Sequence, residues 1–150
     1  MSDVKPTNPK DGAAVHKLPL DLVPASLKVF AALAFAEGAA KYGAYNWRVS
    51  GVRASIYKAA LERHLESWWN GEELDPQTGV PHLASILACA GILLDADLAQ
   101  KLNDDRPPHV AMGDLIRGLE SDVQRIRSLF SDRTPQHCTH SGQAAPSAGV

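Results

Sequence analysis

The sequence predicts an all-α protein: a helical bundle of about four helices that follows an extended N-terminal arm. Four segments carry apolar residues at the three- and four-residue steps of a helix. Proline and glycine separate these segments, and no stretch shows the convincing alternation of apolar and polar residues that marks a half-buried strand. These observations favour helices packed on helices.

The first 24 residues are expected to form an extended arm and not a helix, because they contain four prolines and little periodic pattern. The segment "KLPLDLVP" has enough leucine and valine to lie along a core, which would hold Lys10 and Lys17 near whatever that core surrounds. Residues 132–150 have almost nothing to bury and are expected to be disordered. The predicted regions are therefore an arm over 1–24, a helical domain over 25–131 and a tail over 132–150.

The first two helices are predicted from their pattern and their end signals. Residues 24–40 are rich in Ala and Leu, with Ser26 as a candidate N-cap and Gly43 as a natural stop. Residues 53–71 form the second predicted helix, which Gly71 ends. Its four-residue steps join Ile56, Ala60, His64 and Trp68. His64 therefore shares a face with apolar residues.

The third predicted helix, residues 81–102, is apolar on nearly every side and should be the central, most buried element. Pro81 suits its first turn. The fourth, roughly 110–131, is amphipathic, with an apolar stripe of Met112, Leu115, Leu119, Val123, Ile126 and Phe130. Because a bundle this small covers an all-apolar helix poorly, a homodimer or homotetramer is expected.

The composition of the chain limits which classes of function are expected. The chain has 150 residues, a formal net charge of -2 and a pI near 6.3, so it offers no basic surface for nucleic acid. Cys89 lies in an apolar run and Cys138 in a polar tail, which predicts free thiols and no disulfide framework. The sequence shows no signal peptide and no run long enough to cross a membrane. A cytoplasmic protein is expected.

Common catalytic motifs are absent from the sequence: it has no glycine-rich phosphate loop, no G-x-S-x-G and no paired C-x-x-C. The segment "HCTH" has metal-ligand residue types but lacks a second pair at zinc spacing, so an unstructured end is favoured there. The informative segment is "HLESWWNGEELDPQTGVPHL", residues 64–83, which places carboxylates between two histidines. Carboxylate oxygens, with gaps for water and phosphates, suit Mg²⁺.

Each candidate ligand has an ordinary structural alternative. Glu62 and Glu66 follow Lys58 at four-residue steps, which is typical of exposed ion pairs; a solvated role is favoured for Glu62, and Glu66 is a runner-up ligand. A histidine on an apolar face, such as His64, is more often a core residue bonded to a carbonyl. The acids of the loop can simply solvate a turn: Glu72, Glu73 and Asp75.

Three blocks in order carry a family resemblance: "NPKDGAAVHKLPLDLVP", "FAEGAAKYGAYNWR" and "RHLESWWNGEELDPQTGVPHLA". Together they resemble the phage dATP/dGTP diphosphohydrolase family of the MazZ type, which is related to MazG-like all-α nucleoside triphosphate pyrophosphohydrolases. The resemblance covers about residues 8–95. It implies a MazG-like helical catalytic domain that uses Mg²⁺, with Mn²⁺ as a substitute. The implied reaction converts dGTP and dATP to monophosphate and pyrophosphate, in phages that use 2-aminoadenine and therefore in a host cytoplasm.

The resemblance also suggests where the metal lies. MazG bundles hold Mg²⁺ with four acids on two helices, whereas here His64 and His82 fall near acid positions and Ser85 replaces an aspartate. Glu37 from the first helix and acids from the loop would restore the missing charge. The expected metal ligands are Glu37, His64, Glu72, Asp75 and His82, and the expected catalytic residues are Glu37, Asp75 and Glu72.

The substrate groups follow from the chemistry of a nucleotide. Cations would neutralise phosphate oxygens: Lys10, Lys17, Lys41 and Arg63. The segment "KYGAYNW" offers stacking rings and an amide for a purine edge, through Tyr42, Tyr45, Asn46 and Trp47. The alternative for this segment is a packed helix connector. For the whole chain, the alternatives are a non-catalytic nucleotide-binding regulator and a helical assembly protein.

Overall fold

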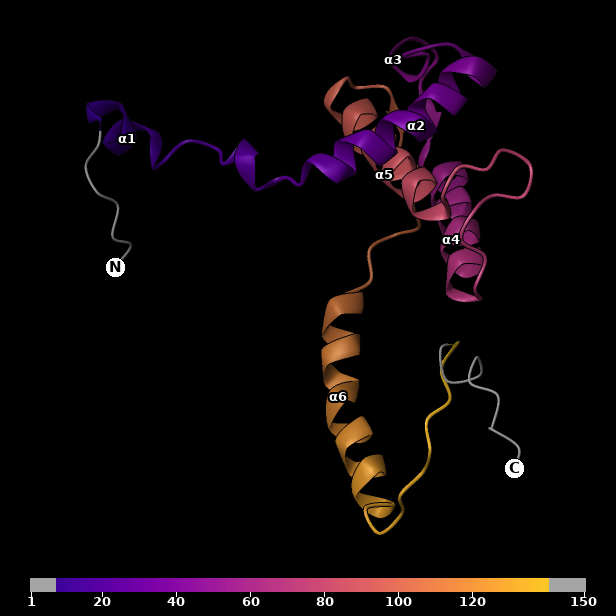
Figure 1. The fold of residues 1–150 in the computed structure, drawn as a ribbon. Coiled ribbons are helices and arrows are strands. Elements are labelled where there is room, and N and C mark those ends of the chain that lie inside the picture. Colours follow the sequence, from indigo (N-terminus) through magenta and orange to yellow (C-terminus); the bar gives the residue numbers. More distant parts are fainter. Residues whose placement is uncertain (1–7, 141–150) are drawn as a thin grey trace, which may run out of the picture. The chain divides into compact units, whose positions relative to one another are not determined.

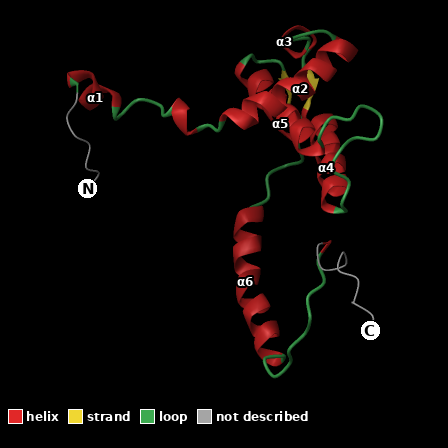
Figure 2. Ribbon diagram, viewed as in Figure 1, coloured by secondary structure: helices red, strands yellow, loops and turns green. Residues whose placement is uncertain are grey.

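A computed structural model describes residues 8–140 of the chain. The chain divides into two compact units, residues 1–103 and residues 104–150. Figure 1 shows α2, α4 and α5 grouped in the first unit and α6 in the second. Helices dominate, and the strands are two short segments (Figure 2). The predicted all-α class is confirmed.

All four predicted helices are present. They are α2 (Ala25–Tyr42), α4 (Ala54–Trp69), α5 (His82–Leu98) and α6 (Met112–Leu129). Gly43 ends α2 as predicted, with a φ of 88° and its N–H bonded to the carbonyl of Ala39. The prediction of Ser26 as N-cap is wrong, because Pro24 takes that position and Ser26 lies in the first turn.

The prediction that the arm contains no helix is wrong, because it includes a short helix, α1 (Pro9–Ala14). The Asn8 side chain caps it by accepting the N–H of Lys10 at 2.9 Å, and Pro9 tolerates the first helical position because its missing N–H has no partner there. A single 3-10 turn, η1 (Leu20–Leu22), follows. The expected packing of the arm on the core is not seen, since its leucines are exposed: Leu18, Leu20 and Leu22.

α5 is central, as predicted, because it packs against α2, α3 and α4. Its buried residues are His82, Ala84, Ser85, Ala88 and Ala96. The alanines let neighbouring helices approach closely, since a methyl group occupies little space. The expectation that this helix is buried on all sides is wrong, however. Leu94 is 71% exposed and Leu98 is 86% exposed, because the neighbours within one chain cover only part of the helix.

A parallel pair of two-residue strands joins the start of α4 to the end of α5. β1 (Val52–Arg53) pairs with β2 (Leu102–Asn103), and the N–H of Val52 donates to the carbonyl of Lys101 at 3.0 Å. The prediction that the chain has no strands is therefore wrong here, since a strand of two residues is too short to show alternation in the sequence. The chain reaches this pair through α3 (Trp47–Ser50) and Gly51.

The second unit contains α6, the one helix with assigned bounds in residues 104–140. Its apolar residues include the stripe predicted from the sequence, and charged, polar and glycine residues occupy most of the remaining surface. In the described part of the chain, no helix combines the length and the apolar character needed to cross a bilayer.

Two glycines should respond in opposite ways to a methyl group. Gly51 has a φ of 76°, and a Cβ there would lie 2.8 Å from the carbonyl oxygen of Lys101. Gly51→Ala should destabilise the chain by about 1–3 kcal/mol. Gly38 lies inside α2 with nothing near its missing Cβ, so Gly38→Ala should stabilise by about 0.5–1 kcal/mol. Urea unfolding followed by circular dichroism measures both, and equal effects would contradict the strained geometry at Gly51.

Candidate functional site

The loop between α4 and α5 is closed by Asp75. Its Oδ1 accepts the backbone N–H groups of Gln77 at 2.9 Å and Thr78 at 3.0 Å. Its own N–H donates to the carbonyl of Val80 at 2.9 Å. An aspartate before proline is suited to such a turn, because its side chain can accept from the backbone two and three residues on. The loop therefore returns the chain to α5 in a defined path.

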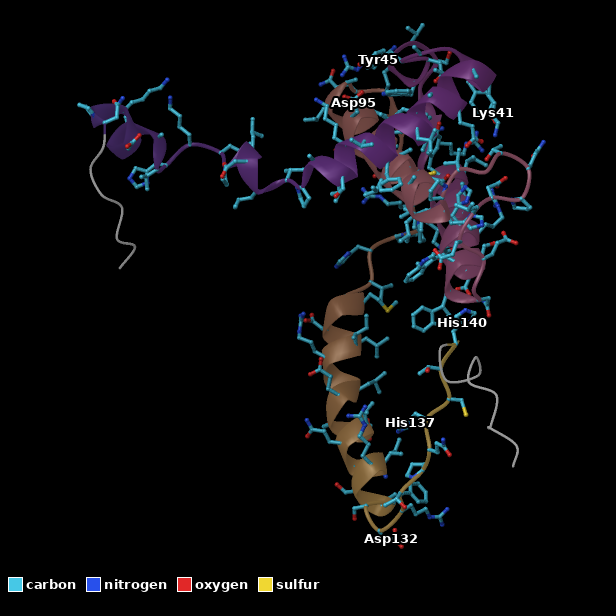
Figure 3. All side chains as sticks on the ribbon, in the orientation of Figure 1. Lys41, Tyr45, Asp95, Asp132, His137 and His140 are labelled. Atoms are coloured by element: carbon cyan, nitrogen blue, oxygen red, sulfur yellow. The ribbon has the colours of Figure 1, made fainter. Side chains whose placement is uncertain are left out.

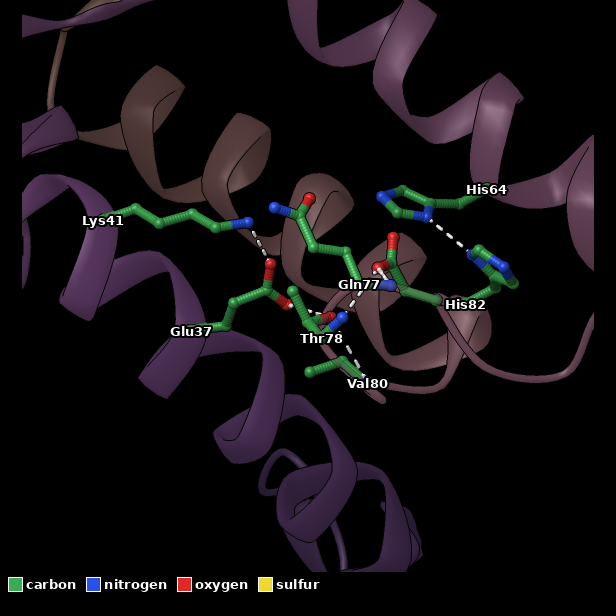
Figure 4. Close-up of polar contacts among 8 residues, drawn as sticks. Glu37, Lys41, His64, Gln77, Thr78, Val80 and His82 are labelled. Carbon is green, nitrogen blue, oxygen red and sulfur yellow. Dashed lines mark hydrogen bonds and ion pairs between the residues drawn. The ribbon is translucent and has the colours of Figure 1, made fainter.

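This path brings two histidines together. His64 comes from α4, and His82 is the first residue of α5. Their Nδ1 atoms lie 2.9 Å apart, and Figure 4 shows the two rings facing each other. His82 is only 3% exposed. Its Nε2 lies 2.7 Å from Oε1 of Glu72, and its backbone N–H donates to the carbonyl of Glu73. The ring of His82 is thus held on both sides.

Three of the five predicted metal ligands form one cluster. Each of His64, Asp75 and His82 offers a ligand atom within 4.8 Å of the other two. Glu72 is not part of this cluster; it contacts the far nitrogen of His82. Two neutral imidazoles and one carboxylate can together hold a divalent cation.

Glu37 borders the cluster from α2. It forms an ion pair with Lys41, one helical turn later, and its Oε2 accepts a hydrogen bond from Oγ1 of Thr78 at 3.4 Å (Figure 4). Thr78 therefore connects the loop to α2. The sequence analysis missed this threonine; the signal for it is its place three residues after Asp75, where a turn exposes the hydroxyl.

The charge states suit a metal. Partial burial and the neighbouring His82 lower the pKa of His64, and this outweighs the carboxylates of Asp75 and Glu37, which act to raise it. Burial acts to raise the pKa of Asp75, but hydrogen bonds from Thr78 and Gln77 hold the pKa of that carboxyl below its usual value. At neutral pH His64 is therefore neutral and Asp75 ionised, which are the states that metal ligands need.

The predicted base-binding segment divides into packed and exposed residues. Trp47 is buried, with its ring against Phe35 and Tyr45 and its indole N–H donating to Oδ2 of Asp95 at 2.6 Å. Tyr42 and Tyr45 are exposed, and Asn46 is the N-cap residue of α3, where its side chain makes no capping hydrogen bond. Trp47 thus occupies a packing position and Tyr45 contacts both Trp47 and Arg48, whereas Tyr42 presents an open ring.

Arg48 and Asp95 form a paired contact that the sequence analysis missed. The guanidinium donates from Nε at 2.8 Å and from a terminal nitrogen at 2.7 Å to the two carboxylate oxygens. Arg48 also lies over the ring of Tyr45, 5.0 Å from its centroid. Figure 3 shows Tyr45 and Asp95 at this same end of the bundle. Residues 47 positions apart in sequence give no local signal of such a pair.

The remaining candidates lie outside the cluster. Lys10 and Lys17 are exposed on the arm, and among the described residues neither side chain has a hydrogen bond or ion pair with the site. Glu62 pairs with Lys58 at 2.7 Å on an exposed face, as expected for a solvated residue. Arg63 is exposed and close enough to His64 to affect its pKa.

The fold and the site together define a small helical protein with a histidine and carboxylate cluster suited to a divalent cation. Residues 7–106, about two thirds of the chain, match the family described as "dATP/dGTP diphosphohydrolase, N-terminal", and the chain belongs to this family. The resemblance found in the sequence is thereby confirmed. Comparison with curated proteins and with solved structures gives no match.

The contact between Asp95 and Arg48 makes stability depend on pH in acid. Hydrogen bonds from Arg48 and Trp47 lower the pKa of Asp95 from 3.8 to about 2. A carboxyl whose pKa falls on folding stabilises the chain above about pH 4 and loses that effect as the pH falls towards 2. Asp95→Asn should lower Tm at pH 5–7 and show a shrinking difference from wild type between about pH 4 and 2.

Thermal unfolding followed by circular dichroism across this range tests the effect. Glu62→Gln is the matched control, because it removes one charge from an exposed pair and should change Tm little at any pH. A difference between wild type and Asp95→Asn that does not change with pH would exclude the ionised contact as its cause.

Proposed function

We propose that the chain hydrolyses the purine deoxynucleoside triphosphates dGTP and dATP to monophosphate and pyrophosphate. In this reaction a water oxygen bonds to the α phosphorus, the bond from that phosphorus to the α–β bridging oxygen breaks, and the water gives up a proton. The observation that carries the proposal is the cluster of His64, Asp75 and His82, which lies within the residues that match the family.

The family resemblance implies Mg²⁺, and the carboxylates near the cluster fit it. Mg²⁺ is usually held by one or two carboxylates together with substrate phosphates. Asp75 meets this need because its carboxylate offers a ligand atom close to both histidines, and hydrogen bonds from Thr78 and Gln77 lower its pKa. Glu37 provides a second carboxylate from α2. A bound divalent cation would make water more acidic and neutralise charge that builds on the phosphates.

The chain's own residues would position the substrate. Lys41 is fixed beside the site by its ion pair with Glu37, and the hydrogen bond that its ammonium donates to Glu37 raises the pKa of Lys41, so it stays positive for phosphate oxygens. Arg63 adds a second exposed cation next to His64 in the sequence. The exposed ring of Tyr42 offers a surface for a purine, Tyr45 could take this role if Arg48 moved off its ring, and Asn46 offers an amide for the purine edge.

The proposed reaction also has a biological role. Hydrolysis of dATP would remove adenine nucleotide from the pool, and hydrolysis of dGTP would supply dGMP. Both outcomes serve phage DNA synthesis with 2-aminoadenine, the setting suggested by the sequence resemblance to MazZ-type enzymes.

We also propose that the chain is a homodimer or a homotetramer. The exposed leucines of α5 and the exposed apolar side chains along α2 support this: Leu94, Leu98, Leu27, Phe30 and Leu33. Exposed apolar patches of this kind mark interaction surfaces. Light scattering at micromolar concentration should give a mass of two or four chains, and a monomer at that concentration would exclude the assembly.

The function is tested with a panel of four deoxynucleoside triphosphates. Pyrophosphate and monophosphate should appear from dGTP and dATP when Mg²⁺ or Mn²⁺ is added, and more slowly from dCTP and dTTP, whose rings have less stacking area. Binding of nucleotide with no turnover under any of these conditions would instead support a regulator.

Two near-isosteric variants test the carboxylates. Asp75→Asn keeps the turn, because an amide oxygen also accepts backbone N–H groups, yet it holds a cation poorly. It should lower kcat/KM by about 100-fold or more, and so should Glu37→Gln. Glu62→Gln is the matched control and should retain activity. Near-normal turnover in both site variants would remove these carboxylates from the metal and favour Glu66.

A further inference from the structure

The two facing histidine nitrogens have the spacing of neighbouring ligands on one metal ion. Metal–nitrogen bonds of imidazole are about 2.0–2.1 Å long. Two nitrogens 2.9 Å apart, as Nδ1 of His64 and Nδ1 of His82 are, then subtend about 90° at a shared ion. That is the angle between adjacent ligands of a six-coordinate centre. The carboxylate of Asp75 is within reach of both.

Glu72 prepares the nitrogen of His82 for this role. A carboxylate oxygen only accepts hydrogen bonds, so the 2.7 Å contact from Oε1 of Glu72 places a hydrogen on Nε2 of His82. The neutral ring then carries its lone pair on Nδ1, which faces His64. A metal-ligating histidine usually donates its other N–H to a carboxylate or a carbonyl, and that contact fixes both the tautomer and the ring orientation.

The donor set decides the class of ion. Mg²⁺ is a hard cation that takes oxygen ligands and keeps several waters. Two imidazole nitrogens and one carboxylate instead suit divalent ions of the first transition row. Three protein ligands also leave open positions, which a water or a phosphate oxygen can fill.

We propose that His64, Asp75 and His82 hold a resident first-row transition ion, such as Mn²⁺, Co²⁺ or Zn²⁺, with Glu72 as a positioning residue behind His82. Mg²⁺ then arrives with the triphosphate and uses oxygen ligands. This inference deepens the proposed function, because the resident ion lies in the same site, but its test requires no turnover.

The experiment uses the full chain without an affinity tag, stripped of metal by a chelator and titrated with Co²⁺. One Co²⁺ per chain should bind, with absorption bands in the visible region, and Zn²⁺ should displace it. Millimolar Mg²⁺ should not. Displacement of Co²⁺ by Mg²⁺ at comparable concentrations, or no binding of Co²⁺, would overturn the proposal.

Variants locate the site. His64→Gln and Asp75→Asn should each abolish or strongly weaken Co²⁺ binding, while circular dichroism shows an unchanged helical content. Since His82 is buried, its role is tested through Glu72: Glu72→Ala should weaken Co²⁺ binding about 10- to 100-fold, and Glu72→Gln should weaken it less because the amide oxygen still accepts the N–H. Equal affinity in wild type and Glu72→Ala would exclude the positioning role.

Two controls separate this site from adventitious binding. His16→Gln removes an exposed histidine of the arm and should bind one Co²⁺ as wild type does. A tail variant that combines His137→Gln, Cys138→Ser and His140→Gln should do the same. Loss of Co²⁺ in the tail variant, with retention in His64→Gln, would place the metal in the tail and overturn the proposal. A chain that binds Co²⁺ as expected but hydrolyses no nucleotide would leave the metal site standing and the proposed function refuted.

Discussion

The site depends on the contacts that the buried ring of His82 makes. This ring stands at the first position of α5, 3% exposed, and it contacts α4 through His64 and the loop through Glu72. A polar ring in such a place is stable only when both of its nitrogens have partners. The carboxylate on one side and the second imidazole on the other meet this requirement, and the same contacts fix where two helices and one loop converge.

The loop between α4 and α5 is held by hydrogen bonds among its own residues. The N–H of Asp75 donates to the carbonyl of Val80, the carbonyl of Asp75 accepts the N–H of Gly79, and Leu74 and Pro81 form an antiparallel bridge. The loop is thus short and internally bonded, unlike a flexible connector whose groups bond to water. Because Thr78 lies on this turn and contacts Glu37, the position of α2 is linked to the position of the histidines.

The sequence predicted the helices well because their periodic patterns extend over four or five turns. It also predicted His64, Asp75 and His82 as ligands of one site, because a single loop separates the two histidines. It did not predict that Glu72 would support His82 from behind, since the direction of a loop side chain depends on the path of the whole loop. It also missed α1, whose six residues carry too little periodicity. The contact of Arg48 with Asp95 depends on how α3 meets α5, which no local pattern contains.

The hydrogen bonds at the two ends of α4 and α5 restrict how these helices can move. α4 and α5 form a hairpin that is fastened at both ends, by the bonded loop at one end and by the parallel strands β1 and β2 at the other. Antiparallel helices often adjust by sliding along each other, and here that shift would break hydrogen bonds at both ends at once. α2 joins this hairpin through Ala34, which lies in one buried cluster with Val80 of the loop and Ala84 of α5. The hairpin therefore forms a wall of the site that cannot slide without breaking the hydrogen bonds at its two ends.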